Sequence, residues 1–124
     1  MRKTERYLIT FSFFVAAILV FDFIDFLFHG LSPAYIVPER YFRNKAIYGI
    51  LISFIVYLFV QNKKLWTRIL AISLVVSILL QVRYYLEGYS LEFVFLFMVI
   101  HFGILLVTLW LGFKYILDPF LSKG

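Results

Sequence analysis

Four long apolar runs take up most of the chain, and they constrain its fold more than any other feature of the sequence. They cover residues 7–28, 46–62, 69–86 and 93–113. A transmembrane helix needs about 17–25 mostly apolar residues, so each run is long enough to cross a bilayer. The runs are continuous rather than alternating, which argues against transmembrane strands. The sequence therefore predicts an all-α protein, an integral membrane four-helix antiparallel bundle that forms a single domain over residues 1–124.

The composition excludes the other broad classes of protein. Hydrophobic residues make up 64% of the chain and charged residues 15%, against roughly 45–50% and 25% in soluble domains. The chain has no cysteine, so disulfides, thiolate metal sites and cysteine nucleophiles are excluded. The net charge is +5, but no basic cluster interleaved with aromatic residues indicates a nucleic-acid interface. We expect the lipid bilayer as the main partner and no nucleic acid.

The distribution of Lys and Arg predicts the orientation of the four helices, because positive residues favour the cytoplasmic side. An even number of spans places the two termini and the link between the second and third runs on one side. That side carries Arg2, Lys3, Arg6, Lys63, Lys64, Arg68, Lys114 and Lys123. The other side carries the smaller set Arg40, Arg43, Lys45 and Arg83. We therefore expect a multi-pass protein with both its N-terminus and its C-terminus in the cytoplasm.

Ionisable side chains inside the apolar runs are the most informative residues for function, because each costs about 2.5–3.5 kcal/mol near a helix centre. Asp22, Asp25 and His29 recur at helical spacing, so they share one face of the first helix. His101 lies within the fourth run. A rise of about 1.5 Å per residue places Asp22 and His101 at similar depths below the outer ends of their helices. We expect these two side chains to meet.

The third run carries a polar stripe that is predicted to face these residues. Arg83 matches Asp25 in depth, and pairing the two would offset the cost of both charges. This predicts an outer layer of Asp25 with Arg83, toward which the Tyr84 hydroxyl can donate. An inner layer would join Asp22, His101 and Gln81. The predicted ligand- or ion-binding pocket thus comprises Asp22, Asp25, Gln81, Arg83, Tyr84 and His101.

Such a pocket, opening toward the outer side, favours a small transport-type protein or one that binds a ligand or ion. One bundle is too thin to enclose a wide aqueous path, so conduction would require a homo-oligomer. Two alternatives stay open. The first is a membrane-embedded enzyme, metal-dependent or not, that acts on a lipid-like substrate. The second is a structural or accessory subunit whose polar pairs only hold its helices in register. The enzyme is the less favoured, since motifs for a serine triad or a phosphate-binding loop are absent.

No cofactor is firmly implied, although a divalent metal is a further hypothesis. Asp22, Asp25, His29 and His101 have side chains of suitable ligand type. Their spacing matches no fixed coordination geometry. A heme between His29 and His101 is disfavoured, because their depths differ by roughly 10 Å.

The link between the third and fourth runs predicts a tight turn. Gly88 suits a left-handed residue that ends a helix. Ser90 is suited to cap the helix that follows.

Overall fold

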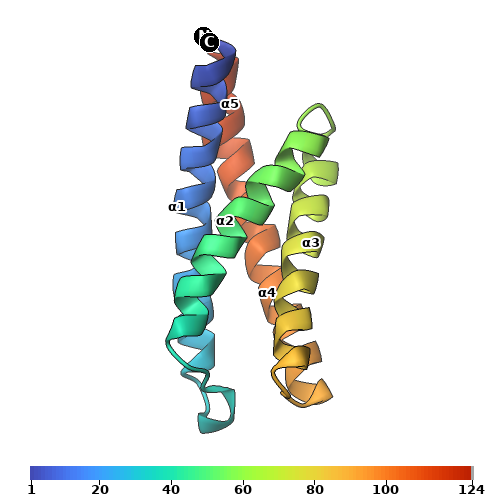
Figure 1. Ribbon diagram of the computed structural model, residues 1–124. Coiled ribbons are helices and arrows are strands. Elements are labelled where there is room, and N and C mark those ends of the chain that lie inside the picture. Colours follow the sequence, from blue (N-terminus) through green and yellow to red (C-terminus); the bar gives the residue numbers. More distant parts are fainter. Residues whose placement is uncertain (124) are drawn as a thin grey trace.

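The computed structural model describes residues 1–123, and every regular element in that range is helical (Figure 1). Its four long helices are α1 (Lys3–His29), α2 (Arg40–Val60), α3 (Leu65–Leu86) and α4 (Leu91–Gly112). Each packs against the next along the chain, and α4 also packs against α1, which closes the bundle. The prediction of an all-α four-helix bundle is confirmed.

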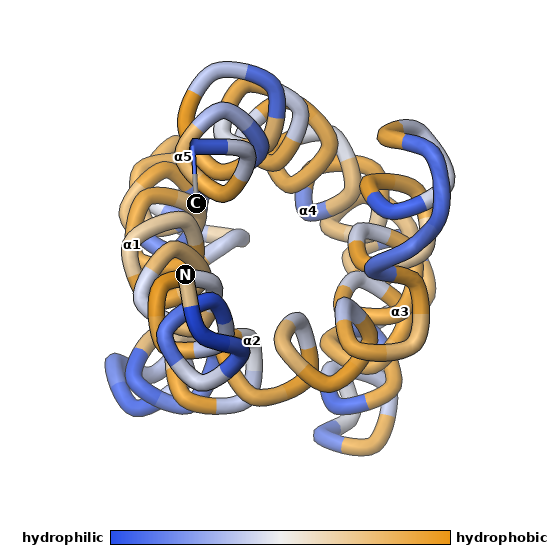
Figure 2. Tube along the Cα trace, turned by 90° about the horizontal axis from the view of Figure 1, so that it is seen from above, coloured by the Kyte–Doolittle hydropathy of each residue, from blue (hydrophilic) through white to orange (hydrophobic). Residues whose placement is uncertain are grey.

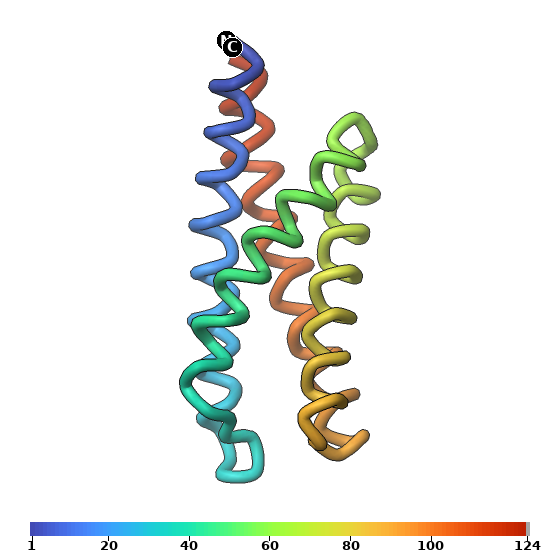
Figure 3. The backbone as a smooth tube through the Cα atoms, in the orientation of Figure 1, coloured from blue at the N-terminus to red at the C-terminus, as the bar shows by residue number. Residues whose placement is uncertain are grey.

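Successive helices run in opposite directions, so the links fall at two ends of the bundle (Figure 1). Both chain ends and the α2–α3 link lie at one end, which we call the terminal end. The α1–α2 link and the α3–α4 turn lie at the other, which we call the distal end. The backbone trace shows that α2 crosses obliquely from the distal end of α1 to the start of α3 (Figure 3).

All four helices are long and apolar enough to cross a membrane. Large apolar side chains point outward along their length, for example Phe23, Phe59 and Val99, which are 62%, 83% and 71% exposed. An apolar surface of this extent is unusual on a soluble monomer. The view along the bundle shows the four helices as a ring of mostly apolar residues (Figure 2).

Two helix boundaries differ from those of the apolar runs. α2 begins at Arg40, well before the run at 46–62, and therefore takes in Lys45. α4 continues through the π-helical turn η2 (Phe113–Leu117) into α5 (Asp118–Ser122). Pro119 lies in the first turn of α5, directly after the π-helical turn, so the helical segment continues past this proline. The last candidate span consequently extends over Leu91–Ser122.

The two links at the distal end are locally well defined. The short helix η1 (Pro33–Tyr35) follows Ser32, whose side chain accepts a hydrogen bond from the Ala34 N–H. In the α3–α4 turn, Gly88 has a φ of 91°, and Ser90 accepts a hydrogen bond from the Phe93 N–H at 3.2 Å. The predicted glycine and serine roles in this turn are confirmed.

The interior of the bundle divides into two packed regions. An apolar core that includes Phe14, Ile72 and Leu105 fills the terminal and middle parts. An aromatic group that includes Tyr41, Tyr84 and Phe97 lies toward the distal end. The polar side chains described next lie at the boundary of this aromatic group.

Candidate functional site

Six polar side chains from all four long helices meet inside the distal half of the bundle. We call them the buried polar cluster. None is more than 6% exposed, and Asp25 and His101 are fully buried. The members are Asp25 and His29 from α1, Lys45 from α2, Gln81 and Tyr84 from α3, and His101 from α4.

Asp25 is the acceptor at the centre of the cluster. Its Oδ2 atom accepts a hydrogen bond from the Lys45 ammonium, with which it forms an ion pair. Its Oδ1 atom lies 2.8 Å from His101 Nε2. Both carboxylate oxygens are therefore paired, which offsets the high cost of burying a charge.

His101 bridges α1 and α3, and its partners fix its tautomer. The Nε2 atom faces a carboxylate oxygen, so it carries the hydrogen and donates it to Asp25. The Nδ1 atom lies 2.6 Å from Gln81 Nε2, which leaves it to accept from that amide. With this assignment of hydrogens the His101 ring is neutral.

His29 is held from both sides of its ring. Its Nδ1 atom lies 2.6 Å from the carbonyl oxygen of Tyr35, so Nδ1 must donate. Its Nε2 atom is then the acceptor, 3.1 Å from both the Lys45 ammonium and the Tyr84 hydroxyl. The ring also stacks on Phe97 with a centroid distance of 4.0 Å. With this assignment of hydrogens the His29 ring is neutral, and contacts on both ring nitrogens and on one face hold its orientation.

The Lys45 ammonium lies inside a cage formed by one carboxylate and two imidazoles. We call Asp25, His29 and His101 the cation cage. The ammonium nitrogen is 3.1 Å from His29 Nε2 and 3.3 Å from His101 Nε2, besides its hydrogen bond to Asp25. The Tyr84 ring centroid lies 5.0 Å from the same nitrogen, within the range of a cation–π interaction. With both imidazoles neutral, the positive and negative charges in the cage cancel.

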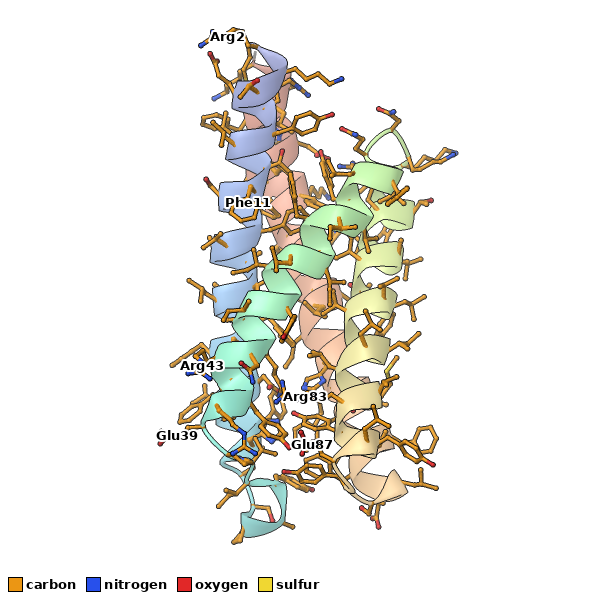
Figure 4. The ribbon with its side chains drawn as sticks, in the orientation of Figure 1. Arg2, Phe11, Glu39, Arg43, Arg83 and Glu87 are labelled. Carbon is orange, nitrogen blue, oxygen red and sulfur yellow. The ribbon has the colours of Figure 1, made fainter. Side chains whose placement is uncertain are left out.

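Arg83 does not take the role that the sequence predicted for it. The cation paired with Asp25 is Lys45, whereas the Arg83 guanidinium lies 4.5 Å from the centroid of the Tyr41 ring. Its nearest acid is Glu87, one turn further along α3, at 4.0 Å. Figure 4 shows Arg83 and Glu87 together near the distal end of α3. The predicted Asp25–Arg83 layer is therefore wrong, because Lys45, from the polar first turns of α2 that precede the apolar run, is the cation that reaches the carboxylate.

The predicted inner layer is also wrong in its choice of aspartate. His101 and Gln81 do meet, but their carboxylate is Asp25 rather than Asp22. Asp22 is only partly buried, and its Oδ1 atom has no hydrogen-bond partner among the described residues. The predicted pairing compared the depth of each residue below the outer end of its own helix, which is valid only if the helix ends lie at the same level. The Asp25–His101 contact shows that α1 and α4 are offset along their axes.

Sequence reasoning missed Lys45, although a signal for it exists. The buried residues of α2 repeat every four positions: Tyr41, Lys45, Gly49, Ser53 and Tyr57. A spacing of four keeps side chains on one helix face. Gly49 and Ser53 are small residues that let helices approach closely. The residue four positions before Gly49, on the same helix face, is Lys45.

Three of the four metal-ligand candidates do come together. One ligand atom from each of Asp25, His29 and His101 lies within 4.8 Å of the others. Asp22 is outside this group. The Lys45 ammonium occupies the space among these three ligands, so the cage holds a positive group of the chain itself.

The cation cage is closed in this structure. Its members are 0–3% exposed, whereas a groove of about 700 Å³ lies elsewhere, between α1 and the α4–α5 segment. That groove is lined mainly by apolar side chains such as Ala16, Val20 and Leu111. Access to the cage therefore requires displacement of Lys45 or separation of a helix contact.

Comparison with known proteins gives no assignment, since no protein-family model, curated protein or solved structure matches the chain. The function of the chain is therefore inferred from the geometry of the buried polar cluster.

Proposed function

We propose that this chain is an integral, multi-pass membrane protein of the ion-binding, transport type, and that the cation cage is its binding site. The four long apolar helices and the apolar outer surface support the membrane location. The excess of Lys and Arg at the terminal end supports an orientation with both termini in the cytoplasm.

The observation that carries the proposal is the Lys45 ammonium at the centre of the cage. An ammonium group is a small monovalent cation, and here it contacts Asp25, His29 and His101 within one buried space. The Asp25 carboxylate and His29 Nε2 suit a free cation of similar size once the lysine withdraws. Intramembrane ionisable residues that face a bundle interior are typical of ion pathways.

Lys45 is suited to leave the cage because of where it stands on α2. It belongs to the distal part of that helix, close to the α1–α2 link. Its four-carbon stem is flexible, and a lysine near a helix end can extend its ammonium toward the membrane surface. In the proposed cycle the ammonium holds the empty cage closed, and an entering cation replaces it.

Flux measurements in liposomes test this proposal. The reconstituted chain should pass at least one of H⁺, Na⁺, K⁺, Mg²⁺ and Zn²⁺ faster than protein-free liposomes do, and Asp25→Asn should abolish that flux. The matched control is Glu92→Gln, which neutralises an exposed acid in the first turn of α4. If no cation exceeds the protein-free rate, or if correctly folded Asp25→Asn conducts normally, the proposal is wrong.

A second candidate is a structural or accessory subunit whose cluster only holds the helices in register. It is favoured by the complete burial of the cation cage and by the balance of charge inside it. Buried hydrogen-bonded networks of this kind can specify one arrangement of helices. Absence of flux, together with a strong effect of the cluster on unfolding, would select this second function.

A transporting form also has to provide a path through the bilayer. A single bundle of four helices encloses no wide aqueous channel, so we propose that the conducting unit is a homo-oligomer. Measurement of the mass of the protein in detergent micelles, with the detergent contribution subtracted, tests this expectation.

A further inference from the structure

We propose that the cation bound by the cage is a divalent transition-metal ion of the Zn²⁺ or Co²⁺ type. This inference rests on the proposed function, because it names the substrate class of the same site. It follows from the ligand atoms of the cage, from the groups that hold its two imidazoles, and from the acid beside it.

The ligand set of the cage discriminates among cations. It offers one carboxylate and two imidazole nitrogens, His29 Nε2 and His101 Nε2, with ligand atoms within 4.8 Å of one another. Imidazole is a good ligand for zinc, copper, iron and nickel, whereas magnesium and calcium prefer oxygen. Two histidines and one carboxylate are also the ligands of many catalytic zinc sites.

The outer hydrogen bonds of the two imidazoles resemble those of metal ligands. A metal-bound histidine usually donates its second ring N–H to a carbonyl or carboxylate group, which orients the ring. His29 already meets this condition, because Nδ1 donates to the Tyr35 carbonyl at 2.6 Å and Nε2 faces the cage. No change of its hydrogen position is needed for metal binding.

His101 needs one rearrangement, and Gln81 provides for it. In the closed cage the His101 hydrogen is on Nε2, so for metal binding it has to move to Nδ1. Gln81 Nε2 now faces Nδ1 at 2.6 Å, and rotation of the amide would present Oε1 instead. That Oε1 atom is buried and has no hydrogen-bond partner among the described residues, so it is available to accept the Nδ1 hydrogen.

Asp22 supplies the second negative charge that a divalent ion requires. It lies one turn before Asp25 on α1, and its Oδ1 atom is buried without a hydrogen-bond partner among the described residues. With Lys45 in the cage, one positive charge offsets Asp25. With a divalent ion in its place, two positive charges would face two carboxylates.

Cobalt titration of the purified chain provides the direct test. The protein is purified without a polyhistidine tag, since a tag would bind the probe, and Co²⁺ is added in detergent solution. We expect one Co²⁺ per chain with the visible absorption bands of a nitrogen- and oxygen-ligated ion. His29→Asn and His101→Asn should each abolish the bands, whereas Glu92→Gln should leave them unchanged.

Two further variants test the roles of Gln81 and Lys45. Gln81→Leu should weaken Co²⁺ binding about 10–100-fold, as expected when an outer hydrogen bond of a ligand is removed. Lys45→Met removes the competing ammonium and should tighten Co²⁺ binding by about tenfold or more, equivalent to about 1.4 kcal/mol. If Lys45→Met fails to fold, the wild-type titration and the two histidine variants still decide the question.

The outcomes separate this inference from the proposed function. If Co²⁺ gives no bands, or if the bands persist in folded His29→Asn and His101→Asn proteins, the transition-metal inference is wrong. A monovalent flux that still depends on Asp25 would then leave the cation-transport proposal standing. If Co²⁺ binds as expected but no cation crosses the membrane, the site is a metal site and the transport function is wrong.

Discussion

Lys45 of α2 and Asp25 of α1 form an ion pair in the interior of the bundle, where they are 2% and 0% exposed. The pair joins two helices directly, and through His101 and Gln81 it reaches the other two. No other ion pair among residues 1–123 lies so far from solvent, apart from the contacts of Asp25 with the two histidines. The stability and the proposed function of the chain both depend on this pair.

Removal of one partner of this pair should destabilise the protein strongly. Asp25→Asn or Lys45→Met leaves an uncompensated buried charge, and we expect each to lower the free energy of unfolding by about 3–5 kcal/mol. The double variant should recover most of that loss, because it removes both charges. Denaturant unfolding in micelles, followed by circular dichroism, measures the effect. Strictly additive losses in the double variant would show that the two residues are not coupled.

The ion pair at the terminal end should contribute much less. Arg68 of α3 makes two hydrogen bonds to Asp118 of α5, both at 2.8 Å, but the Asp118 side chain is 37% exposed. Water screens such a pair, so Asp118→Asn should cost only about 1 kcal/mol. Thermal melting in micelles should show a small decrease in the midpoint, with Glu92→Gln as the control. A loss as large as that of Asp25→Asn would contradict this ranking.

Two glycines of α4 should respond differently to alanine. A Cβ atom added at Gly112 would lie 2.6 Å from Phe13 Cζ, whereas one added at Gly103 would meet nothing within 4 Å. The Phe13 ring is stacked on Phe113, so its movement disturbs a packed contact. We expect Gly112→Ala to cost about 1–3 kcal/mol, and Gly103→Ala to be neutral or stabilising by up to about 1 kcal/mol. Equal unfolding free energies for the two variants would refute the close approach of α1 and α4 at Gly112.

The proposed orientation can be tested with single cysteines, because the native chain has none. Asn62→Cys at the terminal end should react with a membrane-impermeant maleimide only after the cell membrane is permeabilised. Ala34→Cys at the distal end should react in intact cells. Both positions are exposed and lie outside the long helices, so neither change should disturb packing. The reverse labelling pattern would place both termini outside the cytoplasm.

The helices were predictable from the sequence because their cause is local. A long apolar run determines a spanning helix by its length, and Gly88 and Ser90 determine a turn by their own backbone and side-chain preferences. These features need no knowledge of the neighbouring helices. The apolar run at 46–62 alone would place the start of α2 too late, but Pro38 favours a helix start nearby, and α2 begins at Arg40.

The pairs inside the candidate site were only partly predictable. Asp25, Gln81, Tyr84 and His101 all lie in the buried polar cluster, as expected from their positions on polar helix faces. Their partners were not predictable, because the pairs depend on how far the helices slide along one another. A sequence gives spacing within a helix but not that offset between helices.

The membership of the cluster has a consequence for how the protein is made. After α1, α2 and α3 have been synthesised, Asp25 already has Lys45, but the imidazole of His101 has not yet been made. Gln81 likewise has no histidine partner until α4 is made. A chain truncated before α4 would leave Gln81 and one carboxylate oxygen of Asp25 without these partners. The last helix to be synthesised therefore completes the hydrogen bonding of the other three.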